Sequence, residues 1–198
     1  FSNLQELDLR DNYLGLDPSG NFNSEGMMLM SRQLTTTKTL KILKLARNAL
    51  RDEDITWLCG AIAFMPNMQE LDISGNQLTG IGMTSLKEAI ISHSALDEGQ
   101  GLAVLDLSYN PLSKAEGINL LCEAIEYTLT IKSLNLRSCM INYDDNEILL
   151  KTLKSNGTIL KLDVGCNEIN GTTEALLMAE VAALNLVFSL RTNHLAVD

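Results

Sequence analysis

Residues 68–78 read MQELDISGNQL, and a phrase of the same form, L-x-x-L-x-L-x-x-N-x-L, recurs along almost the whole chain of 198 residues. The copies begin at residues 4, 40, 68, 102, 131, 159 and, in a degenerate form (NLVFSLRTNHL), 185, so successive starts lie 36, 28, 34, 29, 28 and 26 residues apart. Self-similarity at such a period indicates stacked structural repeats. Because each repeat buries its apolar face on its neighbours, we expect residues 1–198 to form one domain of about seven repeats.

Each copy combines a short strand with a helix. The L-x-L core alternates apolar and polar residues, which predicts a half-buried strand. In the second half, apolar residues recur four apart, as in Leu58 and Ile62 or Leu149 and Leu153, and mark one face of a helix. Trp57 adjoins this face, and we expect it in the core. A helix is wider than a strand, so the copies are predicted to curve into an α/β right-handed solenoid, a horseshoe with a parallel sheet on its concave face and helices on its convex face.

A polar residue closes each strand at a fixed offset. In most copies it is an asparagine, whose side chain is expected to turn inward and bond the backbone groups freed at the strand end: Asn12, Asn48, Asn76, Asn110, Asn167 and Asn193. Cys139 takes this place in the fifth copy. With Cys59, Cys122 and Cys166 it shows no metal-ligand spacing, and we expect four free thiols in a reducing compartment.

The two longest spacings locate insertions at about Gly15–Asn23 and His93–Gly101. Loops on rigid scaffolds often carry function, but a tolerated surface insertion explains each of them as well, and both alternatives stay open. The chain begins three residues before the copy at residue 4 and ends three residues after the last copy, without the polar caps that terminal repeats normally carry. We therefore expect it to be a fragment of a longer protein.

The signature and its amphipathic helix, at 28–29 residues per uninterrupted copy, resemble the ribonuclease-inhibitor-type leucine-rich repeats over essentially the whole chain. Proteins of this class include ribonuclease inhibitor, the sensor regions of NOD-like receptors, tropomodulin, actin capping-protein regulators and the Ran GTPase-activating protein. The resemblance implies a horseshoe that binds another protein without implying which one. The chain departs from ribonuclease inhibitor itself, which is very rich in cysteine and evenly spaced.

Side chains beside the core leucines of each strand are expected on the concave face, where a partner would bind. Arginine and tyrosine are enriched at interface hot spots, and nothing in repeat packing requires them here, so the strongest contact candidates are Arg10, Arg47, Tyr109, Arg137 and Arg191. Asp11, Asp72 and Asp106 complete the candidate set. A row of central aspartates would attract a basic partner or a cation, although the sequence L-D-L is also common in such repeats.

Charge and motifs exclude several classes of function. The net charge of −10 argues against nucleic acid and anionic membranes, which require a basic surface. No apolar run reaches the roughly 20 residues of a membrane span. The two histidines, His93 and His194, lie in different repeats, and no P-loop, nucleophile elbow, zinc motif or dinucleotide fingerprint is present. We therefore expect no enzyme activity, cofactor, metal or small-molecule substrate, and a cytoplasmic location.

Three functions remain in order of preference. The first is a non-enzymatic module that binds a protein partner on a rigid concave surface. The second is the sensor or autoinhibitory repeat array of a larger regulatory switch protein. The third is a GTPase-activating accessory protein, which would need Arg47 or Arg51 to act on a bound GTPase.

Overall fold

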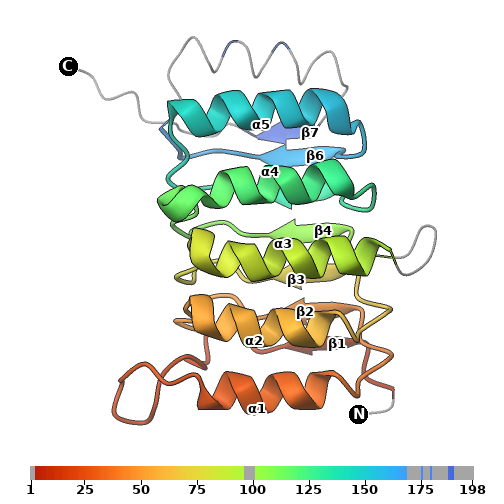
Figure 1. Cartoon of the computed structure of the whole chain (residues 1–198). Helices are drawn as coiled ribbons and strands as arrows, with labels where there is room; N and C mark the ends of the chain where they lie inside the picture. Colours follow the sequence, from red (N-terminus) through yellow and green to blue (C-terminus); the bar gives the residue numbers. More distant parts are fainter. Residues whose placement is uncertain (1–2, 96–100, 169–174, 176–178, 180–186, 190–198) are drawn as a thin grey trace.

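Strands and helices alternate along the chain as the repeat pattern predicts (Figure 1). The computed structural model describes residues 3–95, 101–168, 175, 179 and 187–189. Its elements, in chain order, are β1 (Glu6–Asp8), α1 (Glu25–Leu34), β2 (Ile42–Lys44), α2 (Asp52–Ile62), β3 (Glu70–Asp72), α3 (Gly80–Ser94), β4 (Val104–Asp106), the 3-10 turn η1 (Lys114–Glu116), α4 (Gly117–Tyr127), β5 (Ser133–Asn135), α5 (Tyr143–Asn156), β6 (Lys161–Asp163) and β7 (Val187–Ser189).

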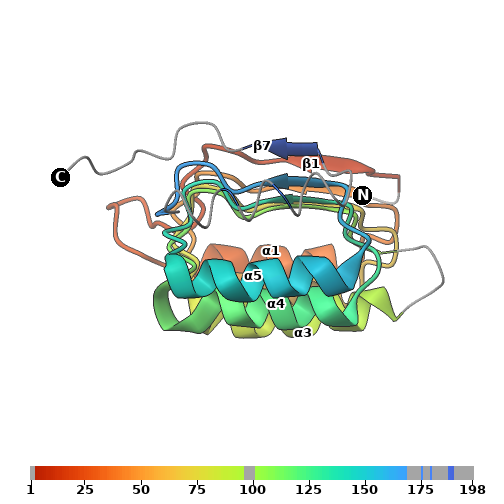
Figure 2. The same cartoon turned by 90° about the horizontal axis from the view of Figure 1, so that it is seen from above.

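The strands form one parallel sheet in the order β1-β2-β3-β4-β5-β6-β7, so each repeat pairs only with its sequence neighbours. The helices lie in a single layer over one face of this sheet (Figure 1). Seen from above, the end strands β1 and β7 curve away from the helix layer (Figure 2). The sheet therefore lines the concave side of the solenoid, and the helices line its convex side, as the sequence predicts.

The repeat leucines fill the space between the two layers. In β2 to β6 the middle residue of the strand, such as Leu43, Leu71 or Leu105, is at most 1% exposed. The register pairs these leucines directly across the sheet, Leu43 with Leu71 and Leu71 with Leu105. On the helical side Leu58 and Leu149 are fully buried, as their spacing predicts. A continuous apolar column thus runs through the first six repeats.

The repeat asparagines tie each repeat to the one before it. Asn76 Oδ1 accepts the backbone N–H groups of Asn48 and Leu50, both at 3.0 Å. Its Nδ2 donates to the carbonyl oxygens of Leu45 and Ile73. Asn48, Asn110 and Asn167 are buried in the same way and repeat this pattern, which confirms the inward orientation expected from sequence. Asn12, in the first repeat, lies exposed and bonds the carbonyls of Leu9 and Arg10.

Cys139 keeps only part of this pattern. Its Sγ donates to the carbonyl oxygen of Leu107 at 3.3 Å, as the amide nitrogen of an asparagine would. A thiol has no strong acceptor atom to match a carboxamide oxygen. Burial raises the pKa of this thiol to about 12, as it does for Cys59 and Cys122. Cys59, Cys122 and Cys139 are buried free thiols, and Cys166 is half-buried.

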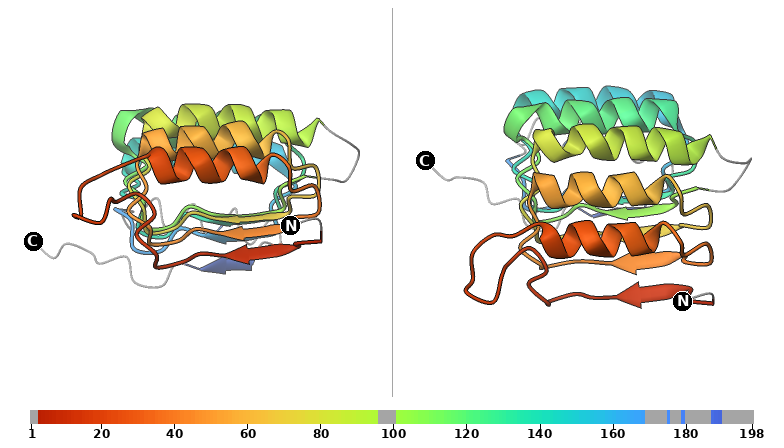
Figure 3. Two further views of the ribbon diagram at one scale, coloured as in Figure 1. Left: turned by 90° about the horizontal axis from the view of Figure 1, so that it is seen from below. Right: turned by 60° about the horizontal axis from the view of Figure 1, so that its bottom comes forward.

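The first insertion is an ordered loop at the edge where the strands end (Figure 3). Leu16 and Phe22 form an antiparallel bridge, and the Asp17 carboxylate accepts the N–H groups of Ser19 and Asn21 at 2.8 and 2.9 Å. These backbone bonds hold the pKa of Asp17 below its usual value. These bonds order the loop internally, and the Gly15 N–H donates to the carbonyl oxygen of Asn48 at 2.9 Å, which fastens the start of the loop to the second repeat. This leaves open whether the loop binds anything.

Some expectations are wrong or fall outside the described residues. Trp57 is 40% exposed, because it precedes the buried Leu58 on α2 and so points away from the core. Most of the second insertion, Arg191, His194 and nearly all of the seventh copy lie outside the described residues; within that copy, Val187–Ser189 forms the expected strand beside β6. Within the described part of the chain, no helix has the length and apolar character to cross a bilayer.

Candidate functional site

The open face of the sheet carries two columns of side chains in exact strand register with one another. One column contains Glu6, Ile42, Glu70, Val104, Ser133 and Lys161, and the other contains Asp8, Lys44, Asp72, Asp106, Asn135 and Asp163. All of these residues are at least partly exposed. The sequence-predicted residues Asp72 and Asp106 are therefore placed on the concave face.

The central aspartates Asp72, Asp106 and Asp163 lie in a row with Asn135, as the sequence indicates. Lys44 separates Asp8 from Asp72, and Asn135 separates Asp106 from Asp163, so Asp72 and Asp106 are the one directly adjacent pair among β1–β6. Among the described residues, no group of three or more His, Cys, Asp or Glu side chains is placed to hold a metal ion.

These aspartates also have a structural role in their own repeats. Asp72 Oδ1 accepts the backbone N–H and the hydroxyl of Ser74, at 3.0 and 2.6 Å. Asp106 bonds Ser108 in the same way at 2.9 and 2.6 Å, and its Oδ2 accepts from Asn135 Nδ2 at 2.8 Å. A short polar side chain that bonds the backbone two residues later stabilises a turn. This contact accounts for the recurrent L-D-L sequence without a ligand.

At the N-terminal end of the face, the arginines are paired within the chain. Arg10 Nη2 lies 2.6 Å from Asp8 Oδ2, and Arg47 makes two hydrogen bonds with Asp11, at 2.6 and 2.7 Å. The hydrogen bonds from Arg10 lower the pKa of Asp8 to about 2, and those from Arg47 lower the pKa of Asp11. A partner carboxylate would have to compete with these pairs. The guanidinium groups of Arg10 and Arg47 are thus already paired with carboxylates of the same chain, which the sequence alone did not indicate.

Further along the face, Tyr109 and Arg137 come together on adjacent repeats. Tyr109 is 57% exposed, and its backbone N–H donates to the carbonyl of Arg137 at 2.8 Å. The Arg137 Nη2 donates to Cys166 Sγ at 2.9 Å, and its Nη1 lies 4.0 Å from Asp163 Oδ1. A hydrogen bond with the Tyr109 side chain is the main cause that raises the pKa of Arg137. This pair joins an exposed aromatic ring to a positioned guanidinium group, a combination typical of interface hot spots.

In the first six repeats, the residue before the repeat asparagine, or before Cys139 in its place, has a left-handed backbone. The positive φ angles lie between 53° and 63° in Asp11, Arg47, Gly75, Tyr109, Ser138 and Cys166. Glycine takes this conformation without cost, whereas any other residue is disfavoured by about 1–2 kcal/mol. Gly75 shows that the backbone itself does not need a side chain here. Three of the candidate residues, Asp11, Arg47 and Tyr109, therefore stand on a mildly strained backbone.

A hollow of about 460 Å³ lies beside Tyr109, where the strand-to-helix loops of the third to fifth repeats meet; we name it the edge pocket. Its lining includes Gln77, Thr79, Tyr109, Pro111, Lys114 and Met140. Sequence reasoning identified only Tyr109 among them. The signal for Pro111 and Met140 was their position directly after Asn110 and after Cys139, the residue in the asparagine slot.

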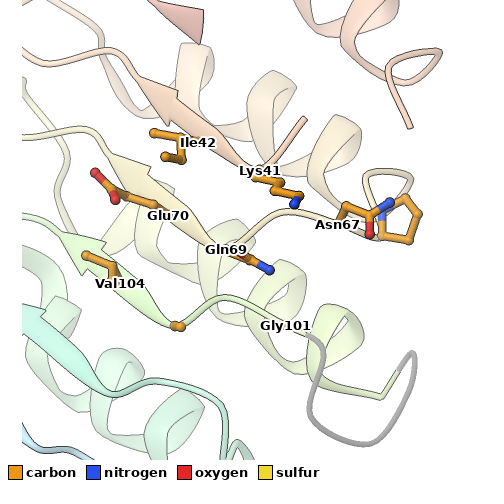
Figure 4. Close-up of a pocket in the computed structure, with 9 residues that line it drawn as sticks. Lys41, Ile42, Asn67, Gln69, Glu70, Gly101 and Val104 are labelled. Atoms are coloured by element: carbon orange, nitrogen blue, oxygen red, sulfur yellow. The ribbon is translucent and has the colours of Figure 1, made fainter. Parts of the chain in front are cut away.

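A second hollow, of about 400 Å³, lies at the opposite edge, where β2, β3 and β4 begin. Ile42, Glu70 and Val104 lie side by side across the three strands, with Lys41 and Asn67 at the outer end (Figure 4). Glu70 is flanked by two aliphatic side chains, but Lys44 Nζ lies 3.9 Å from its carboxylate. The lining thus combines both signs of charge with mostly polar groups.

The residues required for the GTPase-activating alternative are already engaged. Arg47 pairs with Asp11, and the Arg51 guanidinium stacks over the Phe22 ring, with 3.0 Å from its central carbon to the ring centroid. Both arginines are therefore held by contacts inside the chain.

His93, one of the two histidines, is buried, with Nε2 2.9 Å from the carbonyl oxygen of Met65. Its side chain is likewise held by a contact inside the chain.

Comparison with known proteins identifies the repeats in two places. Family models described as Leucine Rich Repeat match residues 3–24 and 64–87. Residues 3–24 contain the copy at residue 4, and residues 64–87 contain the copy at residue 68.

Curated relatives match a larger part of the chain. NACHT, LRR and PYD domains-containing protein 13 of Homo sapiens is 30% identical over 142 residues, which is 71% of this chain and 13% of that protein. NACHT, LRR and PYD domains-containing protein 12 of Mus musculus is 28% identical over 204 residues, 90% of this chain and 18% of that protein. The chain thus spans less than a fifth of the length of these relatives.

Solved structures share the architecture. The C-terminal domain of tropomodulin from Caenorhabditis elegans has a TM-score of 0.59 at 12% identity, with 91% of each chain covered. A leucine-rich repeat-containing protein of Legionella pneumophila has a TM-score of 0.60 at 20% identity, covering 94% of this chain and 56% of that one. At such identities the likeness shows a common fold and nothing more specific.

Proposed function

The chain is a leucine-rich repeat protein of the ribonuclease-inhibitor type, and from that premise we propose that it is a non-enzymatic module that binds a protein partner on its concave face. Its repeats resemble those of interaction and regulatory proteins. The observation that carries the proposal is the exposed Tyr109 beside the positioned Arg137. A surface formed before binding limits the entropy lost when a partner docks.

In this proposal the partner contacts extend along the face. They comprise Arg10, Asp11, Arg47, Asp72, Asp106, Tyr109, Arg137 and Arg191. The ion pairs at the N-terminal end contribute orientation and charge complementarity, while Tyr109 and Arg137 supply most of the binding energy. The net charge of −10 favours a protein over nucleic acid or an anionic membrane. Three buried thiols accord with a cytoplasmic location, which we also propose.

The experiment is affinity capture from cells that express the protein, with the chain as bait and mass spectrometry as readout. We compare the unmodified chain with an Arg47→Glu/Arg137→Glu variant, and use Trp57→Ser on the helix layer as the matched control. A partner of the concave face is lost from the double variant and retained by the control. Identical capture by all three chains would contradict the proposal.

The relatives favour a second function, in which the chain is part of a longer protein. Both are named for NACHT and PYD domains as well as for the repeats, and the chain matches only 13% and 18% of their lengths. We propose as the alternative that the repeats form the sensor or autoinhibitory array of a larger regulatory protein. Sequencing the full transcript tests this, because the alternative requires a nucleotide-binding domain upstream of the repeats.

A GTPase-activating role is the least favoured of the three. It would require Arg47 or Arg51 to leave Asp11 or Phe22 before reaching a bound GTPase. Stimulation of GTP hydrolysis that is lost in Arg47→Ala and Arg51→Ala variants would support it. Equal stimulation of GTP hydrolysis by the variants and the unmodified chain would contradict a role for these two arginines.

A further inference from the structure

The edge pocket lies outside the concave columns, on the border that the strand-to-helix loops form. It is open toward solvent between the third, fourth and fifth repeats, and Tyr109 belongs both to it and to the concave face. In Figure 1 this border is the side toward which the strand arrows point. A partner segment that leaves the concave face near Tyr109 would therefore meet this pocket next.

The pocket offers an apolar anchor site. Tyr109 and Met140 are 57% and 55% exposed, and Pro111 is half-buried between their repeats. Both exposed side chains stand on left-handed backbone, with φ of 57° and 60°. The repeat needs no large side chain at the Tyr109 position, because Gly75 occupies it in the previous repeat. Tyrosine and methionine are both enriched in protein interfaces.

The pocket has the opposite charge to the chain as a whole. Lys114 is its one charged lining residue, in a chain with a net charge of −10. Within the described part of the chain, no carboxylate lies within 4.0 Å of the Lys114 amino group. By contrast, Lys44 and Lys87 have such partners at 2.8 and 2.9 Å. Lys114 is thus an exposed cation next to an apolar surface, which complements a carboxylate beside an apolar side chain.

We propose that the edge pocket docks an extended segment of the partner protein that places one apolar side chain against Tyr109 and Met140 and one carboxylate beside Lys114. This inference rests on the proposed protein-binding function and deepens it by defining the chemistry of the bound segment. The hollow at the opposite edge lacks this character, because Lys41 and Glu70 give it both signs of charge.

The test uses a display library of random 12-residue peptides selected against the immobilised chain. The expected consensus has an aliphatic or aromatic residue with Asp or Glu within three positions. A synthetic peptide of that consensus is then titrated against the unmodified chain, Lys114→Glu and Met140→Ser. We expect each substitution to weaken binding about tenfold or more.

Matched controls carry the same changes at the other edge. Lys132→Glu alters an exposed lysine, and Leu129→Ser alters a residue that is 67% exposed; both should leave the affinity unchanged. A charge exchange completes the design: a peptide with Lys in place of its acid should bind Lys114→Glu better than it binds the unmodified chain. That recovery cannot come from a variant that has lost its fold.

Three results overturn the proposal: no enriched consensus, a consensus without an acid, or equal weakening by Lys132→Glu. A peptide whose binding is lost in Arg47→Glu/Arg137→Glu but kept in Lys114→Glu and Met140→Ser binds the concave face instead. That outcome rejects the edge pocket and leaves the proposed function in place. If both sets of variants still capture the partner as the unmodified chain does, the edge pocket and the proposed concave binding face are both rejected.

Discussion

The side-chain oxygen of Asn76 lies 3.0 Å from the backbone nitrogen of Asn48, 28 residues earlier in the chain. Each such bond links the end of one strand to the end of the next, and Asn167 makes the same bond to Cys139 at 2.8 Å. Among the described repeats, the carboxamide is absent at one position, where Cys139 stands in place of the asparagine.

Cys139→Asn should raise the free energy of unfolding. The new carboxamide oxygen would accept the N–H groups at the end of the fourth strand, and one well-placed hydrogen bond contributes about 1 kcal/mol. Urea denaturation followed by circular dichroism measures the change. As a control, Cys59→Asn places an amide on a buried helix face and should destabilise the chain. A lower free energy of unfolding in both variants would show that the space around Cys139 is too small for an asparagine side chain.

Two glycines should respond in opposite ways to alanine. A Cβ atom on Gly80 would lie 1.7 Å from the carbonyl oxygen of Ala115, where the loop before α4 crosses the start of α3. A Cβ on Gly60 meets nothing within 4 Å. We expect Gly80→Ala to lower the free energy of unfolding by about 3 kcal/mol, and Gly60→Ala to raise it by about 0.5–1 kcal/mol. The unfolding temperatures of the two variants measure these effects. Similar shifts of the unfolding temperature in both would contradict the close approach at Gly80.

The backbone at Tyr109 should accept glycine more readily than the backbone at Gly75 accepts alanine. Tyr109→Gly relieves a left-handed residue but adds freedom to the unfolded chain, so stability should change by less than about 1 kcal/mol. Gly75→Ala introduces strain at φ 63° and brings the new Cβ within 2.8 Å of Arg47 Cγ, which should cost about 1–2 kcal/mol. Chemical denaturation measures both. A large loss in Tyr109→Gly would mean that the tyrosine stabilises the fold.

The contribution of the Asp8–Arg10 pair to stability should depend on pH in the acid range. The pKa of Asp8 is lowered to about 2 by Arg10, below its unfolded value near 3.8. The folded chain therefore releases this proton more readily, so the pair stabilises the fold above about pH 4 and loses its effect as the pH falls through 2. In Arg10→Gln the Asp8 pKa should return toward 3.8, as read by NMR titration of the carboxyl carbon. An unchanged pKa in this variant would assign the shift to another group.

The architecture was accessible from sequence because the leucine pattern and the packing have the same period. The core positions Leu43 and Leu58 and the inward asparagines follow from spacing alone. The ion pair between Arg47 and Asp11 does not, since it joins residues 36 apart through the strand register. Trp57 was misplaced because position next to a core residue does not fix the direction of a helical side chain.

The candidate site shows the same division. Tyr109 and Arg137 were identified by residue type, but their contact depends on neighbouring strands being in register. Lys114 and Met140 were missed because the pocket between them arises from loops of different repeats, each of which looks ordinary in sequence. The hydrogen bonds that the Ser74 and Ser108 hydroxyls donate to Asp72 and Asp106 also had no visible signal in the sequence, since these serines read as surface residues.

The asparagine bonds have a mechanical consequence. Because each one joins a repeat only to its predecessor, tension along the stack is carried by a chain of separate joints rather than shared by the whole body. Among the described repeats, the joint between the fourth and the fifth has a thiol where the other joints have a carboxamide. Under a pulling force the array should yield there first, dividing the solenoid between Tyr109 and Arg137, the two residues on which the proposed binding face depends.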